Sequence, residues 1–448
     1  MKTKTSEKSE QEEGHIIGFL AVQPYFLTVG QPGGFKTESD FYKYAAKECG
    51  FEGVTVPAGM PFIDINAART SVTYRDQLQA RFKGFGLKHG LLRLEMHVVG
   101  QNVCLAPSRV LRFGNFLAPD SFRKRSHLEL EKMAAREMEN IIDASAKLGF
   151  RHIVGFCGGR GYPMAQAKWS AWPKHLPAWV LGLLAYKWEP ILEYAADRGQ
   201  VITFEIGHPE NDLLTGQNLV TFRKMLSKKA RRAVGLNADP SHFLNVGVNP
   251  IPHFDVAIDD GCEVTNHHKG GAVVDQQDGN GSPYGGWQQW SEASTSFYTI
   301  GTIGSESIIR EYTGLVTDYI INQQGGPPII YEGECVLFKN PKQAMRIGAH
   351  NCRALRDDDA LIRVENVVES ELQEVLETGF DNNRKPEIDD PAGKETKIEK
   401  WAGGPFDKFA DSPVPAPELL SMNAEETKGV MKILERFGDS PAAAIGKA

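Results

Sequence analysis

The chain alternates eight times between a short apolar run and a longer stretch with the periodicity of an amphipathic helix. The short runs are apolar at successive positions, as parallel strands buried on both faces are. Regular alternation predicts a parallel sheet, and eight units predict that it closes into an α/β fold, a (β/α)8 TIM barrel. The expected strands are residues 16–22, 53–56, 91–98, 152–157, 201–206, 233–238, 262–267 and 328–332, and the expected helices are residues 39–49, 74–89, 128–148, 177–198, 221–231, 250–260, 306–322 and 341–356.

An open, doubly wound sheet is the alternative architecture for such a pattern. It needs a phosphate-binding glycine loop after the first strand, with the spacing G-x-G-x-x-G. The glycine-rich segment 30–34 has another spacing and opens no helix, so the barrel is favoured. Long insertions follow the third and seventh expected strands, at 102–125 and 270–296, which places long loops on the C-terminal face of the barrel.

The expected barrel occupies residues 15–360. Residues 1–14 are polar and charged, and we expect them to form a disordered N-terminal tail. Residues 361–448 form a helical and irregular C-terminal extension, with an amphipathic helix at 361–376. A terminal helix follows at 423–437, where Asn423 and Glu426 have the spacing of a capping box.

The composition of the chain limits the classes of partner that it can bind. The 50 Lys and Arg residues against 57 Asp and Glu residues give a net charge of −7, which argues against nucleic acid or an anionic membrane as a partner. No apolar stretch reaches the roughly 18 residues of a membrane span, and residues 1–14 lack the apolar core of a secretory signal. The six cysteines form no C-x-x-C pair. We expect a cytoplasmic protein that forms a homo-oligomer.

Four consecutive expected strands, the fifth to the eighth, end in a residue type that binds metals. The C-terminal ends of barrel strands surround one opening, so these side chains should converge there. A site with three carboxylates and one imidazole suits Mn²⁺ or Mg²⁺, and Co²⁺ or Zn²⁺ is also compatible. Alternatively each residue is an ordinary polar group, but the same position on four strands favours one divalent metal site. The four are Glu205, Asp239, His267 and Glu332.

The sequence around these residues resembles a known family. The segments FEIGHPEND, NADPSHF, NHHKGG, FYTIGTIG and IIYEGE are similar to those of xylose isomerase-like barrels and, more narrowly, of the sugar phosphate isomerase/epimerase group. The resemblance extends over roughly residues 14–360 and implies a barrel with one divalent metal held by Glu, Asp, His and Glu, roles that fall on the same four positions. The chain departs from the group at Gly270, where an acidic residue is usual, and this leaves the substrate open.

Further polar residues lie at the same ends of the strands. The resemblance places a histidine at His242, which could bind a substrate hydroxyl. Each of the others could equally be a polar group satisfied by the backbone or solvent, and Glu334 competes with Glu332 as the ligand of the eighth strand. Arg160, after the fourth strand, is a weak candidate for binding an anion. The candidate substrate-binding residues are His97, His208, His242, Lys269 and Glu334.

A divalent metal between two carboxylates suits proton abstraction next to a carbonyl, through a metal-stabilised enediolate. We expect Glu205 and Glu332 to be the catalytic pair of a sugar isomerase or epimerase in carbohydrate metabolism. Expulsion of a β-leaving group would instead make the protein a lyase, a keto-sugar dehydratase or an enzyme that eliminates the aglycone of a 3-keto-glycoside. A metal-dependent endonuclease is disfavoured by the acidic charge, and a non-catalytic sugar-binding barrel is the remaining alternative.

Overall fold

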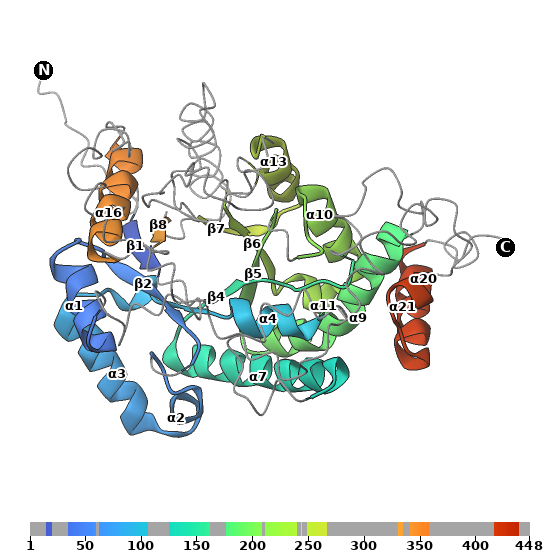
Figure 1. Ribbon diagram of the computed structural model, residues 1–448, viewed down its shortest axis with the longest axis horizontal. Coiled ribbons are helices and arrows are strands. Elements are labelled where there is room, and N and C mark those ends of the chain that lie inside the picture. Colours follow the sequence, from blue (N-terminus) through green and yellow to red (C-terminus); the bar gives the residue numbers. More distant parts are fainter. Residues whose placement is uncertain are drawn as a thin grey trace, which may run out of the picture.

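The strands of the protein form one closed, parallel arrangement. The computed structural model describes residues 15–19, 35–59, 62–105, 125–161, 176–207, 211–239, 243, 249–266, 330–334, 341–357 and 416–438. Within these ranges eight strands form a sheet in the order β7-β6-β5-β4-β3-β2-β1-β8. Strands β7 and β8, at the two ends of this order, approach each other to within 8 Å between Cα atoms, so the sheet curves round on itself (Figure 1). The expected (β/α)8 barrel is confirmed.

Each pair of neighbouring strands is parallel, as the alternation of strand and helix requires. Every residue of β2, β5 and β6 is buried, because the barrel interior covers one face of each strand and the helices cover the other. The strands are β1 (His15–Phe19), β2 (Gly53–Pro57), β3 (Arg93–Glu95), β4 (His152–Gly155), β5 (Val201–Glu205), β6 (Val234–Ala238), β7 (Glu263–Asn266) and β8 (Ile330–Glu334).

The helices surround the strands, and local sequence signals set several of their ends. Capping boxes at Thr37 and Ser126 start α1 and α7, and Gly149 ends α7 in the left-handed conformation with φ 76°. None of the helices in these ranges has the length and apolar character that a membrane crossing requires. They are α1 (Glu38–Lys47), α2 (Ile65–Thr70), α3 (Val72–Phe85), α4 (His97–Val103), α7 (His127–Leu148), α9 (Leu176–Ala196), α10 (Gly216–Met225), α11 (Lys228–Arg231), α13 (Ile251–Asp259), α16 (Pro341–Asp357), α20 (Ala416–Leu419) and α21 (Ala424–Phe437), with one 3₁₀ turn, η1 (His89–Leu91).

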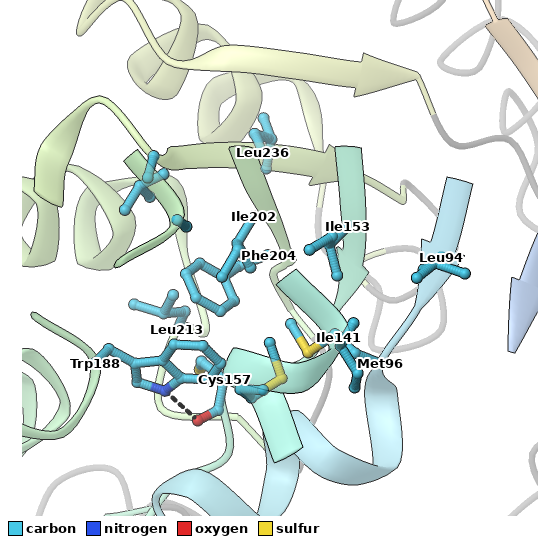
Figure 2. Close-up of a cluster of buried hydrophobic side chains, with 14 of the residues drawn as sticks. Leu94, Met96, Ile141, Ile153, Cys157, Trp188, Ile202, Phe204, Leu213 and Leu236 are labelled. Atoms are coloured by element: carbon cyan, nitrogen blue, oxygen red, sulfur yellow. Dashed lines mark hydrogen bonds between the residues drawn. The ribbon is translucent and has the colours of Figure 1, made fainter. Parts of the chain in front are cut away.

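The core between strands and helices is packed with large apolar side chains. Figure 2 shows Trp188 of α9 beside Phe204 of β5, and their ring centroids lie 4.8 Å apart in an edge-on arrangement. The indole Nε1 of Trp188 donates a hydrogen bond of 2.9 Å to the carbonyl oxygen of Cys157, just beyond the end of β4. The core therefore reaches the C-terminal ends of the strands and fixes backbone there.

The third strand is shorter than the sequence predicts. It ends at Glu95, and the segment expected to continue it to residue 98 turns instead into α4. The Glu95 carboxylate accepts a hydrogen bond from the backbone nitrogen of His97, one of the first N–H groups of α4, which have no partner inside the helix. The apolar residues of this segment suit a strand, so the hydrophobic pattern alone does not reveal the turn.

The helix expected at 221–231 is also different. It begins earlier, as α10, because the Thr215 side chain accepts a hydrogen bond from the backbone nitrogen of Asn218. It is then interrupted at Ser227, whose side chain caps the separate short helix α11. The expectation of one continuous helix is wrong because two capping residues divide the segment.

The last helix of the described chain, α21, packs against α9 of the barrel (Figure 1). The expected capping box is confirmed: Asn423 accepts a hydrogen bond from the backbone of Glu426, and the Glu426 side chain accepts one from the backbone of Asn423. A Cβ on Gly182 of α9 would lie 2.9 Å from Val430 of α21, so glycine permits the close approach of these helices. The helix expected at 361–376 lies outside the described residues.

A buried group of four charged side chains connects α21 to the barrel. Arg160, after β4, lies 2.6 Å from Glu131 of α7 and 2.8 Å from Glu426 of α21. Lys187 of α9 lies 2.7 Å from Glu131. The group therefore contains two positive and two negative side chains. Arg160 is 1% exposed and its charge is matched by carboxylates, so the suggestion that it binds an external anion is wrong.

The same ion pairs predict that acid weakens the attachment of α21. Burial alone raises the pKa of Glu426, but hydrogen bonds from Arg160 and Lys187 outweigh it and lower the pKa from 4.5 to about 2. A lowered folded-state pKa stabilises the protein above pH 4.5, and this contribution, on the order of 3 kcal/mol, disappears as the pH falls towards 2.

Hydrogen exchange of the α21 amides, corrected for the intrinsic effect of pH, should therefore accelerate between pH 4.5 and pH 2. The variant Glu426→Gln should have fast-exchanging α21 amides already at pH 6. Protection that is unchanged over this range in the unmodified protein would contradict the prediction.

Candidate functional site

The candidate site is centred on Glu205, the last residue of β5. Its side chain is fully buried, and Oε2 lies 3.1 Å from Nε2 of His97. The same oxygen accepts a hydrogen bond of 3.1 Å from Nδ2 of Asn237. Asn237 is the register partner of Glu205 on β6, so the pairing of the two strands places its amide beside the carboxylate. Two side chains from neighbouring elements thus hold the orientation of this carboxylate.

His97 lies between two carboxylates. Its Nδ1 contacts Oε1 of Glu95 at the end of β3, and its Nε2 faces Glu205. Burial alone lowers the pKa of His97, but the two carboxylates outweigh it and raise the pKa to about 10, so both ring nitrogens donate. The Phe156 ring packs against the imidazole in a T-shaped arrangement, with 4.1 Å between the centroids.

Glu95 belongs to this candidate site through its contact with His97, and the sequence pattern did not predict it. It is a carboxylate at the C-terminal end of a barrel strand, and that position is the signal by which Glu205 was selected. The expected third strand ran on to residue 98, however, so Glu95 was placed inside the strand. Recognition of the helix that starts at His97 would have revealed it.

Asp239 provides a second buried carboxylate, directly after the neighbouring strand β6. It follows Ala238, the last residue of β6, and is fully buried. It lies two residues beyond Asn237, whose side chain reaches Glu205, and alternate residues of extended chain face the same side. The two negative charges therefore come from adjacent strands at the same end of the barrel.

The structure describes the backbone of Glu332 and Glu334 on β8. Glu332 is in register with Ile17, and Glu334 is in register with Phe19, the last residue of β1. Glu334, and not Glu332, ends the eighth strand, so the expectation that Glu332 lies at the strand end is wrong. Four other candidates, His208, His242, His267 and Lys269, lie outside the described residues.

The described donors fit an oxygen-preferring divalent cation. Glu205 and Asp239 are buried carboxylates at the ends of neighbouring strands, and carboxylate oxygens are the ligands that such cations prefer. Among the side chains that the structure describes, no group of three or more His, Cys, Asp and Glu residues is arranged to hold a metal ion. Of the four predicted ligands, the side chains of Glu205 and Asp239 are described, and those of His267 and Glu332 are not.

Close packing between α4 and the end of β4 holds His97 near Glu205, and it predicts a sensitive glycine. A Cβ on Gly100 of α4 would lie 2.1 Å from the carbonyl oxygen of Phe156, too close without displacement of the backbone. Gly100→Ala should therefore lower the free energy of unfolding by about 1–3 kcal/mol. In α3, a Cβ on Gly84 meets nothing within 4 Å, so Gly84→Ala should instead raise it by roughly 0.5–1 kcal/mol. Urea unfolding of both variants checks the opposite signs, and equal stability of the two would contradict this account of the packing.

The parallel barrel defines the class of protein. Residues 44–273, just over half of the chain, match the family described as xylose isomerase-like TIM barrel, and the chain belongs to this family. No curated protein sequence matches the chain.

The chain is also similar to several solved structures at low sequence identity. One is a xylose isomerase domain protein from Planctomyces limnophilus, with 17% identity over 74% of this chain and 92% of that chain and a TM-score of 0.43. Another is 3-keto-D-glucoside 4-epimerase from E. coli in the apo form, with 14% identity over 75% and 98% and a TM-score of 0.42. A third is a xylose isomerase-like TIM barrel protein from Mycobacterium smegmatis in complex with magnesium, with 13% identity over 78% and 97% and a TM-score of 0.44.

Proposed function

We propose that the protein is a divalent-metal-dependent sugar isomerase or epimerase that abstracts a proton next to a carbonyl. The observation that carries this proposal is the Glu205 carboxylate, fully buried at the end of β5 and oriented by His97 and Asn237. A carboxylate held this way can take a proton from a substrate carbon at a defined position. Membership of the xylose isomerase-like barrel family supports the choice of a sugar as substrate.

In the proposed reaction Glu205 removes the proton from the carbon next to the substrate carbonyl. The electron pair of the broken C–H bond forms a C=C bond, and the carbonyl electrons move to oxygen, which gives an enediolate. In an epimerase, Glu332, from β8, returns a proton to the other face of the same carbon, and the C=O bond re-forms. In an isomerase, Glu332 returns a proton to the former carbonyl carbon; the hydroxyl on the deprotonated carbon then loses its proton and becomes the new carbonyl, while the former carbonyl oxygen gains a proton and becomes a hydroxyl. Glu334, which ends β8, is the alternative donor.

Glu205 and Asp239, with His267 and Glu332, would hold the metal, Mn²⁺ or Mg²⁺. When bound, such an ion supplies a Lewis acid that polarises a substrate carbonyl. His97 fixes one oxygen of Glu205, so the orientation of the carboxylate does not depend on the metal alone. We also propose His97, His208, His242 and Lys269 as groups that contact the sugar.

Deuterium incorporation tests the proposal. The Mn²⁺-loaded protein is incubated in D₂O with free ketoses, ketose phosphates and 3-keto-glycosides, and each sugar is examined by NMR and mass spectrometry. We expect deuterium at a carbon adjacent to the carbonyl, in an epimer or isomer of the sugar added. Release of an aglycone or of water would show a lyase instead. Unchanged sugars with every member of the panel, at full metal occupancy, would refute the proposed enzyme, and sugar binding that persists after chelation would identify a binding protein.

A further inference from the structure

Asn211, in the loop between β5 and α10, joins two strand ends of the site. Its side chain has no solvent exposure. The amide oxygen accepts hydrogen bonds from the backbone nitrogens of Cys157, at 3.0 Å, and Gly158, at 3.1 Å. The amide nitrogen donates a hydrogen bond of 3.2 Å to the carbonyl oxygen of Glu205. One side chain therefore ties the chain that leaves β4 to the last residue of β5.

The chemistry of these partners requires an amide. Two backbone N–H groups need an acceptor on one side of the residue, and a carbonyl needs a donor on the other, so the orientation of the Asn211 amide is unambiguous. Aspartate has the same shape but has no donor when ionised. It would place an oxygen against the carbonyl oxygen of Glu205 and lose that tie while keeping the other two.

The segment after β4 is held from several sides, so it is a firm support. Trp188 donates to the carbonyl oxygen of Cys157, as Figure 2 shows. Gly158 has φ 69° and lies against α4, where an added Cβ would be 2.3 Å from the carbonyl oxygen of Gln101. Helix α4 begins with His97, whose imidazole faces the Glu205 carboxylate. The contacts thus form a closed ring, in which Asn211 holds the backbone of Glu205 and His97 holds its side chain.

The neighbouring residue, Asp212, supports the same loop after β4, but its side-chain hydrogen bonds to this loop do not involve β5. The Asp212 carboxylate accepts hydrogen bonds of 3.0 Å from the backbone nitrogens of Arg160 and Gly161. Asn211 and Asp212 are adjacent, buried and similar in size. Asp212 is therefore a matched control, because its replacement disturbs the β4 loop and leaves the hydrogen bond to the Glu205 carbonyl in place.

We propose that Asn211 is a positioning residue for Glu205: it fixes the peptide at the end of β5 so that the carboxylate is held ready for the metal and the substrate proton. The inference rests on the proposed function of Glu205. It predicts that loss of the amide donor weakens both metal binding and proton abstraction through Glu205, whereas a purely structural role would lower stability without depending on Glu205.

The test compares Asn211→Asp with Asp212→Asn, each alone and in combination with Glu205→Gln. Mn²⁺ affinity is measured by electron paramagnetic resonance, and exchange of the α-proton is measured in D₂O at saturating Mn²⁺ with the panel sugar that the unmodified protein exchanges fastest. We expect Asn211→Asp to weaken Mn²⁺ binding about 10-fold or more, as substitutions of residues that support a metal ligand do. Proton exchange should fall about 10- to 100-fold. Asp212→Asn should change neither by as much as threefold, on the order of the scatter in such comparisons.

The direction of the change in Mn²⁺ affinity separates a positioning effect from a simple charge effect. The new carboxylate of Asn211→Asp adds negative charge near the proposed cation, which alone would strengthen Mn²⁺ binding. In the Glu205→Gln background, Asn211→Asp should cause no further loss of either α-proton exchange or Mn²⁺ affinity.

Asn211→Ala, which adds no charge, is measured in the same way in case Asn211→Asp does not fold.

Three results would overturn the inference. Unaltered Mn²⁺ affinity and proton exchange in folded Asn211→Asp or Asn211→Ala would show that Glu205 does not need the tie. Equal losses with and without Glu205→Gln would show that Asn211 acts elsewhere. Wild-type exchange and Mn²⁺ affinity in Glu205→Gln itself would refute the proposed function, and the inference with it.

Discussion

Replacement of Glu205 with glutamine is expected to lower kcat by about 10²- to 10⁴-fold, the usual contribution of general acid–base catalysis. Oε2 of Glu205 accepts hydrogen bonds from both His97 and Asn237, and the amide oxygen of glutamine can accept the same two. The fold around the site should therefore survive, while the basic oxygen that takes the proton is lost. Because proton transfer occurs in the transition state, kcat should fall more than substrate affinity. Steady-state rates with the sugar identified in D₂O measure the effect.

Metal loss would imitate this result, so kcat is measured at saturating Mn²⁺ with the occupancy determined. Glu332→Gln should show a loss of similar size if Glu332 is the second proton carrier. Glu263→Gln is the matched control: Glu263 begins β7, at the opposite end of the barrel, and pairs with Arg151 and His152. It should lose stability and keep its kcat. A fully metallated Glu205→Gln protein that exchanges the α-proton at the wild-type rate would move the role of base to His242 or Glu334.

Replacement of Asp239 with alanine is expected to remove the bound divalent metal and the activity together. Asp239 is fully buried directly after β6, beside the strand that carries Glu205. Removal of a direct ligand should weaken Mn²⁺ binding by more than the roughly 10- to 100-fold that supporting residues contribute. His267→Ala should have the same consequence. Elemental analysis after dialysis against Mn²⁺ gives the occupancy of each variant.

A surface carboxylate controls for the change of net charge. Asp197 pairs with Lys229 at 2.7 Å and is 57% exposed, so Asp197→Ala removes one negative charge from the surface. This variant should retain its Mn²⁺ in full. Full occupancy in both Asp239→Ala and His267→Ala would show that neither residue is a ligand, and that the four predicted strand-end residues do not form one site.

The architecture followed from local patterns. Apolar runs separated by helical periodicity repeat along the chain, and this order is enough to predict parallel strands, a closed barrel and the face on which the strand ends lie. Capping boxes are equally local, and the one formed by Asn423 and Glu426 was predicted correctly. Glu205 was selected by the same logic, as a carboxylate that ends an apolar run, and the structure places it at the last residue of β5.

Contacts between distant segments could not be predicted in this way. The carboxylate of Glu426 lies against Arg160, 266 residues earlier, and Arg160 therefore serves the packing of α21 and not an external anion. The bond between His97 and Glu205 joins residues 108 positions apart. The partner of a buried polar group depends on which helix or loop packs over it, and hydrophobic periodicity contains no record of that choice.

By itself, the sequence determined the barrel, the order of its strands and the end at which polar strand-end residues gather, because hydrophobic burial and backbone hydrogen bonding act through patterns a few residues long. The tertiary structure alone decided that Glu95 contacts His97, that His97 lies between two carboxylates, and that Asn211 ties the chain after β4 to the end of β5. These roles arise where side chains from separate segments meet in the protein interior. There each donor must find an acceptor, and the fold determines which ones are within reach.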